Sequence, residues 1–128
     1  MFTGDALFNG AHAVTWSSRF SRCVSACDAL LATGAHTFVP GHGRITYRPG
    51  VREIRDRLAS IGAAAAAYAA AGTPLEVAAR LIHSRYAGDW AHPERLFTVA
   101  AAVYEEAGVP GAEDMFSRVA GMAQLANA

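Results

Sequence analysis

The pattern of hydrophobic and polar residues predicts strands at the start of this chain and helices over the rest. Residues 1–4 are expected to end a strand that Asp5 leaves, and residues 36–39 to form a second strand that Pro40-Gly41 ends. Residues 45–47 are expected to form another short extended piece. Between the first two strands, apolar side chains recur at helical spacing and predict a helix over about 18–33. They are Phe20, Val24, Cys27 and Leu31.

Four more helices are expected in the C-terminal part. The first is long and follows Pro49-Gly50, and its apolar residues alternate at three and four positions, which predicts a packing seam over 51–68. Thr73-Pro74-Leu75-Glu76 has the composition of a helix start, and His92-Pro93-Glu94 begins another helix. The last helix carries Met115, Val119, Met122 and Ala126. The predicted class is therefore α/β, beginning strand–helix–strand and ending in helices.

Composition restricts the classes of partner. The chain has 128 residues, enough for one domain with its own core, and its 11 basic and 11 acidic residues cancel. Neither the basic nor the acidic residues are clustered along the sequence, so we expect no nucleic-acid and no membrane partner. Although 52% of the residues are hydrophobic, the longest apolar run, 63–71, is far shorter than the ~20 residues that span a bilayer.

The two cysteines lie four residues apart on one predicted helix face. Cys23 and Cys27 could bind one metal ion together at this spacing. Both lie on the apolar stripe, however, where a free cysteine behaves as a small hydrophobic residue. We therefore favour the core interpretation. Two cysteines form no disulfide framework, and no secretory signal opens the chain, so a cytoplasmic location is expected.

Two side chains that can bind metals follow short apolar runs. Asp5 comes after Gly4, and His42 lies within Pro40-Gly41-His42-Gly43. About one helix of sequence separates them, so they could come from the ends of neighbouring strands and form part of a metal site. The alternatives are that Asp5 caps a turn after the strand and that His42 is a hydrated loop histidine.

Three segments of the sequence resemble the metallo-β-lactamase-fold hydrolase superfamily, closest in style to its glyoxalase II-like and quinoprotein-relay members. They are Phe2-Thr3-Gly4-Asp5, Val39-Pro40-Gly41-His42-Gly43 and Gly50-Val51-Arg52-Glu53. The resemblance implies the C-terminal half of an αββα sandwich over residues 1–108, followed by a helical extension over 109–128. It also implies a metal-dependent hydrolase that cleaves an ester, thioester or amide with a metal-bound hydroxide.

The resemblance assigns both catalytic roles and metal-binding roles to two residues. Asp5 matches the carboxylate that bridges two zinc ions, and His42 matches a ligand of the second ion. One carboxylate can span metals about 3.5–4 Å apart, and the same donors also suit iron or manganese. His12 and Trp16 fall in the loop after Asp5, which in the family lies near the mouth of the site.

One part of the family pattern is missing from residues 1–128. The His-x-His-x-Asp-His cluster, and a further histidine, belong before the position of Asp5. We therefore expect a fragment that binds metal weakly and is inactive alone, and that needs this cluster from a partner chain or from a longer form of the protein. Besides a small-molecule substrate, the expected partner is that chain or a second copy. The alternative is a non-catalytic remnant or interaction module that pairs through an exposed sheet face or through the 51–68 helix seam.

Overall fold

The computed structural model describes residues 1–15, 19–109 and 114–127, and in these residues it is an α/β protein with a small mixed sheet. The strands are β1 (Phe2–Phe8), β2 (Thr37–His42) and β3 (Thr46–Tyr47). The helices are α1 (Phe20–Ala32), α2 (Arg48–Ala70), α3 (Leu75–Tyr86), the short 3₁₀ helix η1 (Pro93–Arg95), α4 (Leu96–Glu106) and α5 (Met115–Ala126). The predicted order of strand, helix, strand and then helices is confirmed.

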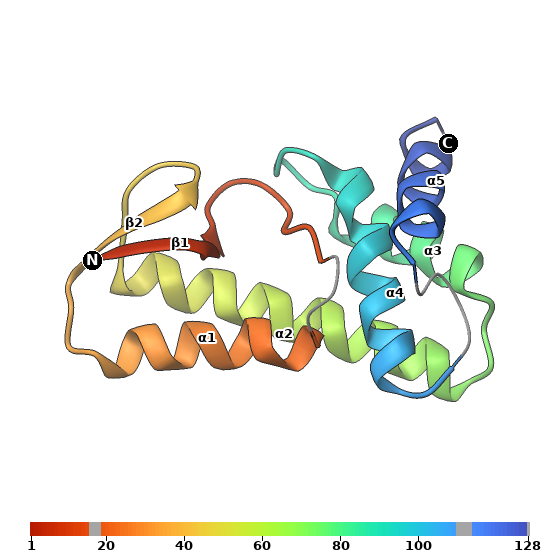
Figure 1. The fold of residues 1–128 in the computed structure, drawn as a ribbon, viewed down its shortest axis with the longest axis horizontal. Coiled ribbons are helices and arrows are strands. Elements are labelled where there is room, and N and C mark those ends of the chain that lie inside the picture. The colour runs from red at the N-terminus through yellow and green to blue at the C-terminus, as the bar shows by residue number, and fades with distance from the viewer. Residues whose placement is uncertain (16–18, 110–113, 128) are drawn as a thin grey trace.

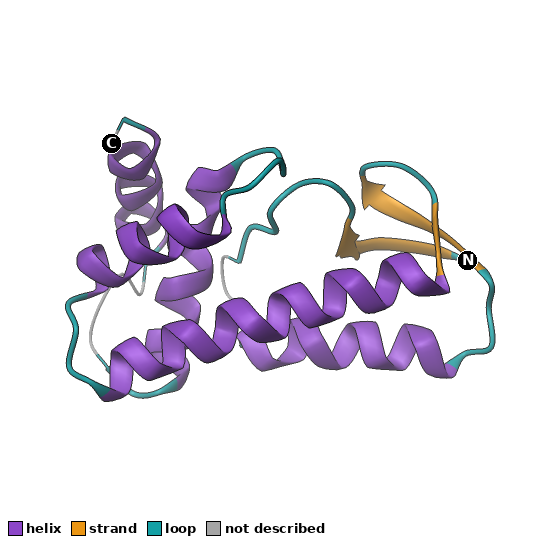
Figure 2. Cartoon of the chain, turned by 180° about the vertical axis from the view of Figure 1, so that it is seen from behind, coloured by secondary structure: helices purple, strands orange, loops and turns teal. Residues whose placement is uncertain are grey.

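The sheet lies at one end of the molecule, on top of two long helices. Strand β2 is central and pairs in parallel with β1 and antiparallel with β3. Helices α1 and α2 run side by side along one face of the sheet, while α3, α4 and α5 gather at the opposite end (Figures 1 and 2). No described helix covers the other face of the sheet. Large apolar side chains are accordingly exposed on or beside the strands, as expected: Met1, Phe2, Ile45 and Tyr47.

The apolar seam of α2 is the centre of the core. Its side chains Val51, Ile54, Leu58, Ile61 and Ala65 are at most 9% exposed. Helix α2 packs against α1 along one side and against α3 and α4 further along its length. The alternative that the 51–68 seam is an exposed contact for a partner is therefore wrong, because the chain's own helices already cover it.

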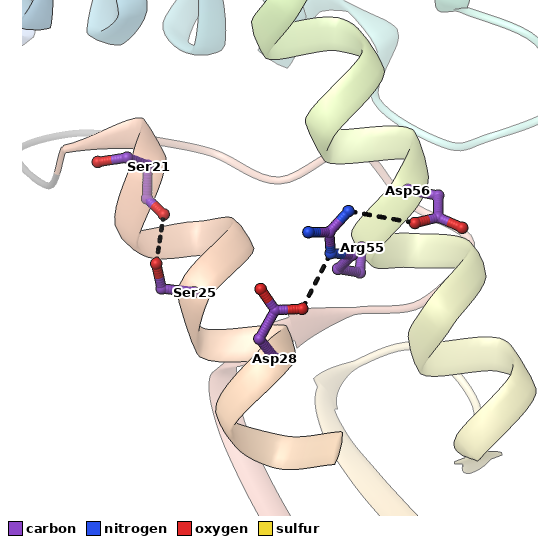
Figure 3. A network of polar contacts seen from close by, with 5 residues as sticks. All are labelled: Ser21, Ser25, Asp28, Arg55 and Asp56. Atoms are coloured by element: carbon purple, nitrogen blue, oxygen red, sulfur yellow. Dashed lines mark hydrogen bonds and ion pairs between the residues drawn. The ribbon is translucent and has the colours of Figure 1, made fainter. Parts of the chain in front are cut away.

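Polar contacts join α1 to its neighbours at the surface. Arg55 of α2 reaches across to α1, where its Nε donates to Asp28 at 2.9 Å, and its Nη1 contacts Asp56 at 3.4 Å (Figure 3). At the start of α1, the backbone N–H and the hydroxyl of Ser21 both donate to the carboxylate of Glu106 at the end of α4. This carboxylate satisfies a donor that the helix itself leaves unpaired.

Three predicted element boundaries are wrong. Strand β1 does not end before Asp5 but continues to Phe8, and β2 does not end at Pro40-Gly41 but continues through them to His42. Helix α2 begins at Arg48 and thus includes Pro49-Gly50. Proline is accepted in the first turn of a helix because the backbone N–H that it lacks has no helical partner there.

Helix α5 is attached to the rest of the fold by a buried arginine. Arg118 is 0% exposed; its Nη1 donates to the carbonyl of Thr15 at 2.8 Å, and its Nη2 donates to Glu105 Oε2 at 2.5 Å. These bonds join α5 to the loop after β1 and to α4. Within the described residues, no helix is both long enough and apolar enough to cross a membrane.

Candidate metal centre

Asp5 and His42 face each other across the two parallel strands. Asp5 Oδ1 lies 3.2 Å from His42 Nε2, and the side chains are 81% and 49% exposed, respectively. His42 is the last residue of β2, whereas Asp5 lies in the middle of β1. The structure therefore brings together the two residues that the sequence singled out, although Asp5 does not stand at a strand end.

An irregularity in β1 places Asp5 opposite the end of β2. The register of the two strands shifts between Phe2 and Gly4 and again between Gly4 and Phe8, and Gly4 has a φ of +54°. Phe8 then pairs with His42, and the backbone N–H of Asn9 donates to the carbonyl of His42 at 3.0 Å. A register shift of this kind redirects side chains, so a residue inside the strand can reach the end of its neighbour.

The glycines on either side of His42 are required by close packing. A Cβ at Gly41 would lie 2.7 Å from the carbonyl carbon of Gly4 and 2.8 Å from Asp5 Oδ1. Gly43 has a φ of +95°, and a Cβ there would overlap the carbonyl oxygen of Asn9. The two strands therefore approach each other at Asp5 more closely than any larger residue allows.

The donor set fits one side of a metal site. A tetrahedral zinc ion with bonds of about 2.1 Å separates two of its ligand atoms by about 3.4 Å, close to the 3.2 Å between Asp5 Oδ1 and His42 Nε2. Catalytic zinc sites have three protein ligands, and nowhere in the described residues do three His, Cys, Asp or Glu side chains converge on one point. Within the described residues, this pair alone falls short of such a ligand set.

The other histidines lie elsewhere. His12 is 2% exposed, and its Nε2 lies 2.9 Å from the carbonyl oxygen of Ala87, so it serves the packing of its loop and not the site mouth. His36 is exposed and His83 is half-buried. His92 Nδ1 lies 3.4 Å from Glu94 Oε1 at the start of η1. Trp16, which the sequence placed beside the site, lies outside the described residues.

The cysteines are packing residues in this structure. Cys27 is 0% exposed, and burial raises the pKa of its thiol to about 11. Burial also raises the pKa of the half-buried Cys23, with the nearby Glu106 carboxylate adding to the effect. The core position predicted for both cysteines is confirmed for Cys27, whereas Cys23 is half-buried and packs against the core.

Sequence reasoning missed a pocket that begins beside Asp5. It has a volume of about 190 Å³ and lies between β1, the loop that follows it, α1, α2 and Trp90. Its walls are made mainly of apolar side chains: Ala6, Phe8, Ala11, Ala13, Val14, Ala26, Ile54, Leu58 and Trp90. These residues are distributed over five segments, so no local motif signals them.

Compared with known proteins, the chain matches no family model, no curated protein and no solved structure.

Proposed function

We propose that this chain provides two ligands, Asp5 and His42, to the two-metal centre of a metallo-β-lactamase-type hydrolase. The observation that supports this most is the 3.2 Å separation of Asp5 Oδ1 and His42 Nε2, two donors that lie 37 positions apart in the sequence (42 − 5). The sequence resemblance gives them the roles of bridging carboxylate and second-ion ligand. Zinc is the proposed metal, with iron or manganese as substitutes.

Each residue has a definite task in this proposal. Asp5 is 81% exposed, so its second carboxylate oxygen is accessible to a second ion. The His42 ring is held against Phe8, with centroids 4.5 Å apart, so Nε2 is directed at Asp5 in advance. When bound, two such metal ions supply an activated water at neutral pH. This water suits hydrolysis of an ester, thioester or amide.

The proposal requires further ligands, because the described residues bring no third metal-binding side chain to this pair. The missing His-x-His-x-Asp-His cluster would come from a partner chain, a second copy or a longer form of the protein. The isolated chain is therefore expected to bind zinc weakly and to hydrolyse nothing. Weak binding should nevertheless depend on both residues together.

A zinc titration of the untagged protein tests this dependence. The wild type, Asp5→Asn, His42→Gln and the double variant are titrated by calorimetry in a chelator-free buffer. We expect each single change to weaken binding at least about tenfold, since the loss of even an outer partner of a metal ligand costs 10–100-fold. The double variant should be hardly weaker than either single one, because both remove the same site.

A second His–carboxylate pair in the same chain provides a matched control. His92 and Glu94 have the same donor types at 3.4 Å but lie at the start of η1, with no glycine next to either of them. His92→Gln should leave the zinc affinity unchanged. If zinc binding persists in the Asp5/His42 double variant, or disappears in His92→Gln, the proposal is rejected.

A non-catalytic interaction module remains the second candidate, because the exposed fractions on the sheet side are large: 87% for Phe2, 55% for Ile45 and 60% for Tyr47. Contiguous exposed apolar surface often marks a protein interface. The two candidates differ in their dependence on Asp5 and His42. An interaction module would lose its partner on Phe2→Ser and keep it in Asp5→Asn, whereas a metal-linked assembly would be weakened by Asp5→Asn.

A further inference from the structure

The pocket beside Asp5 has the size of a small ligand. Its volume is about 190 Å³, compared with the roughly 150 Å³ of an apolar protein cavity that binds benzene. It can therefore hold a single ring or a chain of about six carbon atoms. Ile54 and Leu58 form part of its wall from α2, and Ala26 and Cys23 form part of it from α1.

Few polar groups face this pocket. Apart from Asp5, the side chains in its wall that can form hydrogen bonds are Arg22, Cys23 and the indole of Trp90. Burial raises the pKa of the Cys23 thiol, so this side chain is uncharged at neutral pH. An apolar group would gain by leaving water for such a pocket. The wall holds one basic residue, Arg22, and one acidic residue, Asp5, so it offers no excess charge to a polyanion.

The wall formed by the loop after β1 is fixed in place. The backbone N–H of His12 donates to the carbonyl of Ala91 at 2.9 Å, and the N–H of Ala91 donates to the carbonyl of Gly10 at 2.9 Å. His12 also contacts the Ala87 carbonyl through its ring, and Arg95 donates to the His12 carbonyl at 3.2 Å. The pocket is thus formed before any ligand arrives, which lowers the entropy cost of binding.

We propose that this pocket binds the compact apolar acyl group of a neutral ester, thioester or amide, with the carbonyl at the Asp5 edge. The position of the ligand's carbonyl rests on the proposed function. The apolar acyl group is assigned from the pocket alone. The substrate class is therefore a short aliphatic or single-ring acyl derivative, and not a sugar, a nucleotide or a polyanion.

Primary amides of increasing length test the apolar end without any metal. In a Trp16→Phe background Trp90 is the single tryptophan of the chain, and its fluorescence reports on the pocket that it lines. Acetamide, butanamide and hexanamide are titrated in the presence of a chelator. We expect each added methylene to tighten binding about fourfold, so that hexanamide binds about 15 times more tightly than butanamide.

Two alanines of α1 provide a matched pair of variants. Ala26 lines the pocket, whereas Ala29 is exposed on the same helix and is not part of the wall. Ala26→Leu should fill the pocket and abolish the dependence on chain length, and Ala29→Leu should preserve it. Absence of a chain-length dependence in the background protein, or an equal loss in both variants, overturns the assignment.

The outcome is separable from that of the zinc titration. A chain-length dependence that Ala26→Leu removes supports the pocket even if Asp5 and His42 bind no zinc. Conversely, zinc binding that depends on both residues, with no chain-length dependence, supports the metal proposal and rejects the acyl pocket. The amide series in the background protein decides the question even if Ala26→Leu does not fold.

Discussion

The ring of Phe8 lies flat against the imidazole of His42, with centroids 4.5 Å apart and ring planes within 3° of parallel. Phe8 is only 8% exposed, so it connects an accessible histidine to the buried part of the fold. The orientation of His42 is therefore set by core packing as well as by the strand pairing.

Phe8→Leu should release the His42 ring while largely preserving the core. In the wild type, the aromatic ring shifts the His42 Hδ2 and Hε1 resonances upfield, and the variant should return them to the positions of a hydrated histidine. Since phenylalanine and leucine are both large apolar residues, the loss of stability should stay below about 1.5 kcal/mol. His42 resonances that are the same in both proteins would contradict the stacked arrangement.

Gly41→Ala should separate the two strands at the candidate site. The added Cβ would lie 2.7 Å from the Gly4 carbonyl carbon, and backbone atoms cannot move aside cheaply, so we expect a destabilisation of about 1–3 kcal/mol and the loss of zinc binding. Gly50→Ala is the control, because its Cβ would overlap the Thr46 side chain, away from Asp5 and His42. It should lower the urea midpoint and leave the zinc affinity unchanged; equal zinc affinities in the two variants would refute the role of Gly41.

Protonation of His12 should destabilise the fold at acidic pH. Burial lowers the pKa of His12 below its ordinary value of about 6.5, and the positive charges of Arg57 and His83 lower it further; the Ala87 carbonyl and Glu94 oppose this. Because the folded-state pKa is lower than the unfolded-state pKa, the unfolded chain binds more protons. The stability contributed by neutral His12 is therefore complete above about pH 6.5 and is lost as the pH falls through that value to the folded-state pKa.

His12→Gln removes this titration but can still donate to the Ala87 carbonyl. Urea unfolding of both proteins between pH 8 and pH 5 should show a shallower decline of stability in the variant. The same change at the exposed His36 controls for the general effect of losing a histidine. If the free energy of unfolding of His12→Gln falls as steeply with decreasing pH as that of the wild type, His12 is not the group that titrates.

Arg118→Met should detach α5. The variant loses the bonds to the Thr15 carbonyl and to Glu105, and hydrogen bonds to a charged group contribute about 1.5–3 kcal/mol. The lower part of this range is expected because the Glu105 side chain is 53% exposed and regains water. Arg52→Met, on the exposed side of α2, should change the free energy of unfolding by less than about 0.5 kcal/mol. Equal urea midpoints for the two variants would show that Arg118 does not hold α5.

The sequence predicts the helices well because their cores have a regular period. Val51, Ile54, Leu58 and Ile61 follow the three–four spacing of a buried helix face, and all four are at most 9% exposed. The strand ends were mispredicted because Gly4 and Pro40-Gly41 usually terminate strands. In this fold they allow the irregular pairing of β1 and β2 that continues to Phe8 and His42.

The candidate site is only partly visible in the sequence. Asp5 and His42 stand out through the glycines beside them, and the structure places them in contact. The buried position of His12 depends on a contact with Ala87, 75 positions away. The pocket beside Asp5 likewise depends on Trp90, which lies far along the chain from β1. No pattern within one segment carries such long-range information.

Anomalous X-ray diffraction from crystals soaked in zinc tests the central claim most directly. Data collected on both sides of the zinc absorption edge locate the metal without reference to any assumed ligand. We predict an anomalous peak about 2.0–2.2 Å from both Asp5 Oδ1 and His42 Nε2. A peak at His92–Glu94 or elsewhere with none at this pair, or an Asp5 carboxylate and His42 imidazole too far apart to share one ion, would contradict it.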